Sequence, residues 1–293
     1  MKKPLFTGSA VALITPFNES GVDYKKFEEL IEFHIANKTD ALVVCATTGE
    51  SSTMSDAEHR EALKFAADIA KGRIILIAGT GSNDTNYAIS LSSYAESVGY
   101  DGLLLVTPYY NKATQKGLYL HFKAIADSVN IPIILYNIPG RTGCMISLDT
   151  FKKLDKIPHI IGVKEATGDL AFAGQIAANT DLVLYSGNDD VILPMMAIGG
   201  QGVISVIANI LPKETHDVCV NFLKGDFESA KKEYLKMINL VHALFIEVNP
   251  IPVKTAMNIL GYNVGECRMP LCSMEDKNVE TLKEVMKDYG FKF

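Results

Sequence analysis

One lysine, Lys164, ends the apolar run His-Ile-Ile-Gly-Val-Lys at residues 159–164. A run this rich in branched aliphatic residues is typical of a buried strand in a parallel sheet, where an ammonium group is costly to bury. Desolvation favours the neutral amine, and a neutral amine is the nucleophile that condenses with a ketone to form a Schiff base. Two structural alternatives are open: the side chain could extend to the surface, or it could pair with a carboxylate such as that of Glu165.

Three further apolar runs lead into polar segments that could assist such a nucleophile. A tyrosine whose hydroxyl is linked to a second hydroxyl, such as that of a threonine, can pass protons to and from a carbinolamine oxygen. An arginine nearby would hold a substrate carboxylate through two parallel hydrogen bonds. A single strand tyrosine is usually a packing residue, but the grouping at corresponding strand ends indicates Schiff-base aldol chemistry. The segments are Thr47-Thr48-Gly49-Glu50-Ser51, Pro108-Tyr109-Tyr110-Asn111 and Tyr136-Asn137-Ile138-Pro139-Gly140-Arg141-Thr142-Gly143.

The elements that must position these residues follow a regular order. Short runs rich in Val, Ile and Leu alternate with stretches of helical periodicity over the first two thirds of the chain. Eight strand–helix units predict an α/β fold, a (β/α)8 TIM barrel, whose active residues come from the carboxyl ends of the strands. A doubly wound sheet is disfavoured because no glycine fingerprint follows the first strand. The predicted strands are 9–15, 41–46, 73–79, 102–107, 131–137, 160–165, 182–187 and 202–206.

The first helical segments carry recognisable start signals. From Tyr24 to Ala36 the apolar residues share one face, and Asp23 precedes the segment as a predicted N-cap. Ser55 is the predicted cap of the next helix, followed by Glu58 at capping-box spacing.

The last part of the chain shows no strand pattern. The segments 226–246, 250–260 and 275–289 are predicted helices. We therefore expect a barrel core with the catalytic site over 1–211 and a C-terminal helical region, packed on the barrel, over 212–293. No low-complexity linker separates the two, which indicates one structural unit.

Composition excludes several classes of function. Of the 293 residues, 48% are hydrophobic and 21% charged, and 28 Lys and Arg against 34 Asp and Glu give a net charge of −6. Without a basic block the chain is not expected to bind nucleic acid. No apolar stretch reaches the length of a membrane helix and no secretory signal is visible, so no membrane association is expected. The odd number of cysteines, 5, suits a reducing cytoplasm.

Five segments together resemble the dihydrodipicolinate synthase/N-acetylneuraminate lyase family. They occur in the same order as in that family, and the resemblance extends over essentially the whole chain. It implies an aldolase-type lyase that forms an imine with pyruvate. The segments are Thr-Thr-Gly-Glu-Ser (47–51), Pro-Tyr-Tyr-Asn (108–111), Leu-Tyr-Asn-Ile-Pro-Gly-Arg-Thr-Gly (135–143), Gly-Val-Lys-Glu-Ala (162–166) and Asn-Pro-Ile-Pro-Val-Lys (249–254).

The same resemblance implies a role for each site residue. Lys164 would form the covalent imine with pyruvate, so that no separate cofactor and no metal is needed. The proton relay would consist of Tyr136, Thr47 and Tyr110, with Tyr110 reaching into the site of a neighbouring subunit. Such sharing belongs with a homotetramer built as a dimer of dimers. The pyruvate carboxylate would be held by Thr48 and the backbone of Ile204, with Gly187 nearby.

Arg141 distinguishes the branches within this family. Pro-x-Arg-Thr-Gly resembles the synthases, in which the arginine would bind the carboxylate of L-aspartate 4-semialdehyde, the second substrate of a lysine-biosynthetic (diaminopimelate) step. The sialic acid lyases are similar as far as Asn137 but generally lack this arginine. One departure is Gly140, where the synthases often carry serine. The alternatives are an N-acetylneuraminate lyase, a keto-deoxy sugar acid aldolase, or a non-catalytic barrel that binds pyruvate.

Two other motifs are too incomplete to indicate a ligand. Gly79-Thr80-Gly81-Ser82-Asn83 follows a strand, but it lacks the third glycine of a dinucleotide site and the Gly-Lys-Ser/Thr of a phosphate loop. Cys267 and Cys272 have neither a second cysteine pair nor a nearby histidine, so zinc is not expected.

A final expectation concerns regulation by lysine. By resemblance, lysine-sensitive relatives hold this effector at a dimer interface, and His59, Asn83 and Tyr109 would be remnants of that site. The sensitive pattern usually supplies a carboxylate where this chain has Tyr87, and commonly a histidine where it has Asp56. The loss of a charge-assisted partner for the effector's ammonium predicts that lysine inhibits weakly or not at all. The alternative is that the Asp56 carboxylate takes over this role from a different direction.

Overall fold

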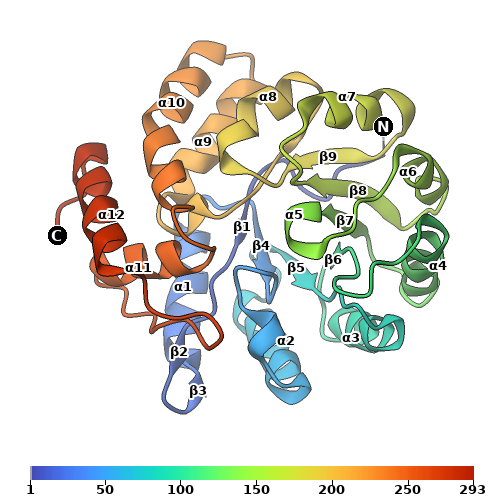
Figure 1. The fold of residues 1–293 in the computed structure, drawn as a ribbon, viewed down its shortest axis with the longest axis horizontal. Helices are drawn as coiled ribbons and strands as arrows, with labels where there is room; N and C mark the ends of the chain where they lie inside the picture. The colour runs from blue at the N-terminus through green and yellow to red at the C-terminus, as the bar shows by residue number, and fades with distance from the viewer. Residues whose placement is uncertain (1) are drawn as a thin grey trace.

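Eight parallel strands close into a barrel in the computed structural model, which describes residues 2–293 (Figure 1). Each strand pairs with its sequence neighbour in the barrel, and β10 returns to pair with β1. A separate two-stranded ribbon, β2 (Phe17–Asn18) and β3 (Gly21–Val22), follows the first barrel strand. The barrel strands are β1 (Gly8–Ala12), β4 (Ala41–Val44), β5 (Ile75–Gly79), β6 (Gly102–Val106), β7 (Ile133–Asn137), β8 (Ile160–Glu165), β9 (Val183–Ser186) and β10 (Gly202–Ser205).

Helices alternate with these strands and surround them. Each of the eight predicted strands is present at its predicted place, so the (β/α)8 prediction is confirmed. The α-helices are α1 (Tyr24–Ala36), α2 (Asp56–Ala70), α3 (Thr85–Ser97), α4 (Gln115–Ala126), α5 (Pro139–Thr142), α6 (Leu148–Leu154), α7 (Leu170–Asn179), α8 (Ile192–Ala197), α9 (Pro212–Leu223), α10 (Phe227–Ala243), α11 (Ile251–Ile259) and α12 (Asp276–Tyr289). Three short 3₁₀ turns are η1 (Ser51–Thr53), η2 (Asp189–Val191) and η3 (Ile207–Asn209).

The predicted helix caps are also present. The Asp23 side chain accepts a hydrogen bond from the Lys26 backbone N–H, and α1 begins at Tyr24, directly after this cap. The Ser55 hydroxyl accepts from the Glu58 backbone N–H at the start of α2. Each cap satisfies an amide that the first helical turn leaves without a partner.

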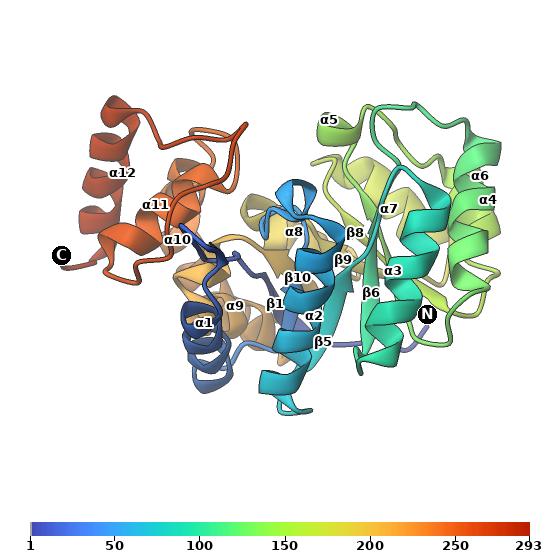
Figure 2. The same ribbon diagram turned by 90° about the horizontal axis from the view of Figure 1, so that it is seen from below.

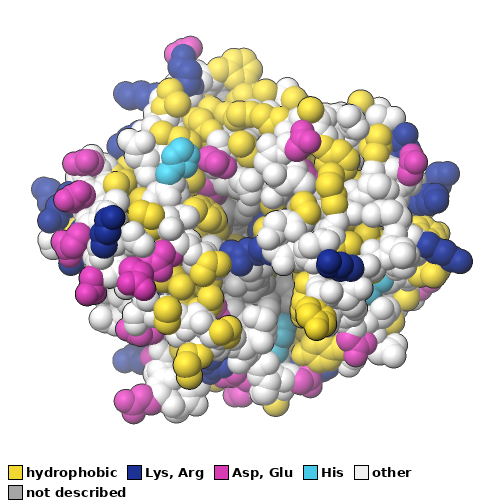
Figure 3. Space-filling model, in the orientation of Figure 1, with side chains coloured by type: hydrophobic (Ala, Val, Ile, Leu, Met, Phe, Trp, Pro, Cys, Tyr) yellow, Lys and Arg dark blue, Asp and Glu magenta, His cyan; other side chains and the backbone are white. Residues whose placement is uncertain are grey.

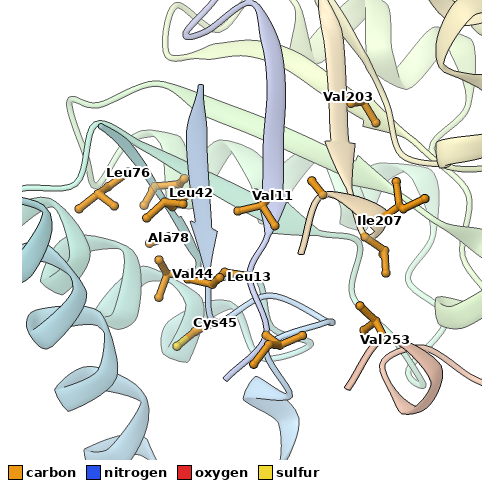
Figure 4. Close-up of a cluster of buried hydrophobic side chains, with 14 of the residues drawn as sticks. Val11, Leu13, Leu42, Val44, Cys45, Leu76, Ala78, Val203, Ile207 and Val253 are labelled. Atoms are coloured by element: carbon orange, nitrogen blue, oxygen red, sulfur yellow. The ribbon is translucent and has the colours of Figure 1, made fainter. Parts of the chain in front are cut away.

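Strand side chains alternate between two separate apolar cores. Val11, Leu42 and Val44 point outward, into the layer between strands and helices that Figure 4 shows. Ala10, Ala41 and Val43 belong to the other cluster, which fills the barrel interior. The interior cluster is closed near the N-terminus by Phe6, whose ring stacks on Tyr185 at a centroid distance of 4.4 Å. With the interior packed, the carboxyl ends of the strands are left for a site.

The C-terminal helices lie to one side of the barrel, beside α1 (Figures 1 and 2). Here α12 contacts both α10 and α11 and is the outermost helix. Helix α9 packs against β1 and β10 and so completes the helical ring, although it follows residue 211. Among residues 2–293 no helix combines the length and apolar character that crossing a bilayer requires.

Candidate active site

The Lys164 side chain points into the barrel interior. Its register partners on the adjacent strands are Tyr136 of β7 and Tyr185 of β9, both in the interior cluster, and residues in register share a face. Lys164 is 4% exposed, and its Nζ lies 4.3 Å from the centre of the Tyr136 ring. Burial lowers the pKa of this amine to about 7, although the carboxylate of Asp189 opposes the shift and Arg141 adds to it. Near neutral pH a large fraction of the amine is therefore the neutral nucleophile.

The side chain of Glu165 lies on the opposite face of the same strand. Its carboxylate accepts hydrogen bonds from Asn137 Nδ2 at 2.8 Å and from the Thr167 backbone N–H at 2.7 Å. Burial raises the pKa of this carboxyl, and the hydrogen bonds from Asn137 and Thr167 lower it. Glu165 thus serves to join the ends of β7 and β8. Neither structural alternative for Lys164, pairing with Glu165 or extension to the surface, is what the structure contains.

Tyr136 is the other buried group beside the amine. Its phenol is 5% exposed and makes a side-chain hydrogen bond with Thr47, which follows β4. Burial raises the pKa of Tyr136 to about 12, and Arg141 and the Thr47 hydrogen bond oppose the shift. The phenol consequently keeps its proton at neutral pH and can donate it to an oxygen that forms beside Lys164.

Thr48 and Arg141 are connected through one residue of the C-terminal region. Asn249 Nδ2 donates to Thr48 Oγ1 at 2.9 Å, and Arg141 Nη2 donates to the Asn249 carbonyl at 3.1 Å. Arg141 lies on the short helix α5, in a segment that the sequence predicted only as a polar strand end. An added Cβ at Gly140 would meet no atom within 4 Å. The structure therefore has room at this position for the serine that the synthases often carry.

Gly187 and Ile204 lie at the carboxyl ends of the next two strands. The Gly187 backbone N–H donates to the Glu165 carbonyl, and a Cβ at this position would come within 2.5 Å of the Ala166 Cβ. Only glycine allows this close approach to the end of β8. Ile204 is fully buried in the interior cluster.

A cavity of about 600 Å³ opens over the carboxyl ends of β4, β5, β6 and β7. Thr47, Tyr136 and Arg141 line it, so three of the predicted site residues face a common space. Tyr136 also covers the Lys164 amine, which places the nucleophile directly beneath the cavity wall. The surface is hollowed near the centre of the face shown in Figure 3, with basic side chains at the rim.

Tyr110 is not brought to this group within one subunit. It is 89% exposed, and its φ of 72° is the left-handed conformation that tyrosine adopts only under constraint. It does not line the cavity. Its role in a neighbouring subunit stays a prediction.

The predicted remnants of an effector site border the same cavity. His59 and Tyr109 line it, and Asn83 Nδ2 donates to the Tyr109 carbonyl at 3.3 Å. Asp56, also in the lining, accepts from Arg60 Nε at 2.9 and 3.0 Å and hydrogen-bonds with Tyr87. Burial lowers the pKa of His59 to about 4, so this ring is neutral at physiological pH.

Two residues near the chemistry were not predicted individually. Asn249 is the first residue of the Asn-Pro-Ile-Pro-Val-Lys segment. Its contact with Thr48 joins residues 201 positions apart, so no local sequence pattern could indicate it. The buried Asp189 carboxylate accepts from the backbone N–H groups of Val206 and Ile207, both at 2.9 Å, and acts electrostatically on Lys164. A polar turn after a predicted strand, Ser-Gly-Asn-Asp-Asp at 186–190, was its only available signal.

Within residues 2–293, no group of three or more His, Cys, Asp or Glu side chains is arranged to hold a metal ion. Cys267 and Cys272 are both unpaired thiols.

The lowered pKa of Lys164 predicts the pH dependence of its nucleophilic step. Below a pH of about 7 the ammonium form has no lone pair, so the rate of imine formation should fall tenfold for each further pH unit. Above that pH the rate should level off. The measurement is the initial rate of reductive trapping of pyruvate on the free enzyme across this range. A midpoint near 10, as for an ordinary lysine, would contradict the buried amine.

A (β/α)8 barrel with a buried, readily deprotonated lysine on its sixth strand and a protonated tyrosine beside it is the arrangement of a Schiff-base, or class I, aldolase-type lyase. The sequence model described as the Dihydrodipicolinate synthetase family matches residues 5–289. The chain therefore belongs to the dihydrodipicolinate synthetase family.

Individual relatives are similar to this chain over nearly their full length. A 4-hydroxy-tetrahydrodipicolinate synthase of Acetivibrio thermocellus is 54% identical over 292 residues, 99% of both chains. The solved dihydrodipicolinate synthase of Acinetobacter baumannii, a chloride-inhibited enzyme complexed with pyruvate, is 45% identical with a TM-score of 0.94, covering 97% of this chain and 99% of its own. A Cyanidioschyzon merolae relative, solved with lysine bound, is 38% identical with a TM-score of 0.95, covering 98% and 99%.

Proposed function

We propose that this protein condenses pyruvate with L-aspartate 4-semialdehyde, the reaction of a 4-hydroxy-tetrahydrodipicolinate synthase in the diaminopimelate route to lysine. The observation that carries the proposal is the buried Lys164 amine, with a pKa of about 7, against the Tyr136 ring. The relatives that match the chain over its full length carry this enzyme's name. No cofactor is required, because the lysine itself activates pyruvate.

The first half of the reaction uses Lys164 and Tyr136. The neutral amine adds to the C2 carbonyl carbon of pyruvate, and Tyr136 donates a proton to the resulting oxygen. A second proton transfer releases that oxygen as water and leaves a protonated imine. The hydrogen bond between Tyr136 and Thr47 lets the phenol regain its proton through a hydroxyl at the cavity. Thr48 and the Ile204 backbone hold the pyruvate carboxylate in this proposal.

The second half forms a carbon–carbon bond. Loss of a methyl proton converts the imine to an enamine, whose terminal carbon attacks the aldehyde of the second substrate. Tyr136 then supplies a proton to the developing alkoxide. The substrate's own amino group attacks the imine carbon, closes the product ring and returns the Lys164 amine. Arg141, at the cavity rim, binds the carboxylate of the aldehyde substrate through its guanidinium.

Arg141 also favours this reaction over those of the related pyruvate-dependent aldolases. A guanidinium at the rim fits a short substrate that ends in a carboxylate, whereas a sugar acid presents hydroxyl groups there. The test is a coupled assay with pyruvate and L-aspartate 4-semialdehyde, run beside N-acetylneuraminate cleavage on the same preparation. Turnover of the semialdehyde alone supports the proposal. Turnover of N-acetylneuraminate alone, or of neither, contradicts it.

We further propose a cytoplasmic homotetramer, a dimer of dimers, in which Tyr110 of one subunit completes the relay of its neighbour. The exposure of Tyr110 and its left-handed backbone support this arrangement, since strain of this kind occurs where surroundings fix a conformation for function.

Subunit complementation checks the sharing of sites. Tyr110→Phe and Lys164→Met variants should each be nearly inactive alone. A hybrid dimer of the two contains one site with both native residues, so random reassortment should restore about a quarter of wild-type activity. Tyr119→Phe, a change at a half-buried tyrosine of α4 that does not line the cavity, serves as the matched control and should behave as wild type. Recovery of no activity after verified subunit exchange would contradict the sharing.

Lysine should inhibit this enzyme weakly or not at all. The only carboxylate among the cavity-lining residues near Tyr87 is Asp56, and Arg60 and Tyr87 already occupy it. Without one charge-assisted contact, the binding free energy of lysine should weaken by about 1.5–3 kcal/mol, which is one to two decades of affinity. Titration of L-lysine in the coupled assay should give half-inhibition above about 1 mM. Half-inhibition far below that concentration would show that Asp56 exchanges Arg60 for the effector.

A further inference from the structure

A fully buried ion pair joins the C-terminal region to the loop that carries Thr47 and Thr48. Lys254 Nζ, on α11, donates to Glu50 Oε1 at 2.9 Å, and the two side chains are 2% and 1% exposed. The ammonium donates also to the Glu266 carbonyl at 2.8 Å, and the second Glu50 oxygen accepts from the Arg268 backbone N–H at 2.8 Å. The hydrogen-bond partners of both charges thus come from residues 250–268 and the loop itself, and the Phe17 ring lies 4.5 Å from the ammonium.

Glu50 closes the turn in which the two threonines lie. Its backbone N–H donates to the Thr47 carbonyl at 3.1 Å, and its carbonyl accepts from the Thr53 backbone N–H at 3.0 Å. The φ of Glu50 is 55°, a left-handed conformation that is unfavourable for a residue with a side chain. Such a conformation persists only where the surroundings fix it, and the fixed carboxylate does so here.

The pair is not needed to attach α11 to the barrel. Val253, the residue before Lys254, is fully buried in the outer core on the side of Ile207, as Figure 4 shows. A buried ion pair contributes no more to stability than apolar residues of similar volume would, because desolvation offsets the attraction. What the ion pair adds over such residues is a fixed direction for the Glu50 side chain and therefore for the turn.

A second contact from the same region acts on the same loop. Asn249, just before α11, donates to Thr48 Oγ1 and accepts from Arg141. Movement of α11 relative to the loop would consequently shift both the predicted pyruvate site and the arginine at the rim.

We propose that Lys254 and Glu50 are positioning residues that hold the Thr47–Thr48 turn in the geometry required for imine formation with pyruvate. The expected effect on imine formation rests on the proposed function. The expected effect on the conformation of the turn rests on the loop contacts alone. Neither residue touches the reacting atoms; both act through the backbone of the turn.

The test replaces the pair by neutral residues of similar volume, in Glu50→Gln/Lys254→Met. The control, Asp68→Asn/Lys64→Met, removes a solvent-exposed ion pair on α2 in the same way. Both variants should fold, because neither leaves an unpaired buried charge. The KM for pyruvate should rise, and the rate of borohydride-trappable imine formation should fall, each by about tenfold or more in the first variant only. Lys254→Arg, which keeps a cation opposite Glu50, should recover part of this loss.

Amide hydrogen exchange gives a readout that does not depend on catalysis. Exchange at residues 47–53 should accelerate in Glu50→Gln/Lys254→Met, while exchange in the barrel strands should not change. Normal pyruvate kinetics together with unchanged exchange in this loop would overturn the proposal. If the wild-type protein traps no pyruvate, the proposed function fails, and the exchange experiment still decides whether the pair positions the turn.

Discussion

Replacement of Lys164 by methionine should remove the condensation activity while leaving the barrel folded. Methionine has nearly the volume of lysine and no nucleophile, so the covalent route is lost and the rate should fall by about 10³-fold or more. The variant should unfold at the same or a higher temperature, since burial of the amine opposes its charged form in the wild-type protein. The coupled assay and a thermal melt measure the two effects.

The matched control for this substitution is Lys123→Met. Lys123 is a partly exposed lysine of α4 paired with Asp127, and exposed pairs of this kind contribute about 0.2–1 kcal/mol. The Lys123→Met variant should therefore retain wild-type kinetics. Activity of the Lys164→Met variant above about a tenth of wild type would mean that another group activates the ketone.

Replacement of Arg141 by alanine should impair use of the aldehyde much more than imine formation with pyruvate. Arg141 is exposed in the free protein, and the bound substrate would desolvate its pair with the carboxylate. Truncating one partner of such a pair costs about 2–5 kcal/mol, which corresponds to a loss of about 30-fold to several thousand-fold in kcat/KM for the aldehyde. Removal of this cation should also raise the pKa of Lys164, because Arg141 is one of the groups that lower it.

Arg141→Lys separates charge from geometry at the same position. Lysine keeps the cation but not the planar pair of donors, so it should restore only part of the aldehyde kinetics. The steady-state rate is measured against both substrates in turn. Unchanged aldehyde kinetics in Arg141→Ala would remove the main argument for this substrate over a sugar acid.

The barrel could be predicted from the sequence because its signals are local. Strands buried on both faces are nearly continuous apolar runs, and eight of them at regular spacing leave few other folds. The capping residues Asp23 and Ser55 act within one helical turn of their own positions, so the chain itself specifies where α1 and α2 begin.

The place of Lys164 at the end of a buried strand was predictable from the same rule of position, whereas its imine chemistry was inferred from the family resemblance and stays a prediction. A lysine at the carboxyl end of a buried strand faces the interior together with its register partner Tyr136, and burial then lowers the amine's pKa. Because side chains alternate along a strand, Glu165 must lie on the face opposite Lys164. Its hydrogen bond with Asn137, however, depends on the register between β7 and β8.

The support of the site could not be predicted in this way. Asn249 reaches Thr48, and Lys254 reaches Glu50, over 201 and 204 positions of sequence. These contacts depend on how the C-terminal helices dock on the barrel, and no periodicity or spacing reports that packing. The helical region after the barrel therefore contributes directly to the predicted substrate site.

The central claim, that Lys164 forms a covalent imine with pyruvate, is tested most directly by reductive trapping on the wild-type protein. Incubation with pyruvate and borohydride, followed by peptide mass spectrometry, should place one reduced adduct per chain on Lys164 and none on the other lysines. The adduct should be absent in Lys164→Met and present in Arg141→Ala. A label on a different lysine, or no label under conditions that support turnover, would contradict the account.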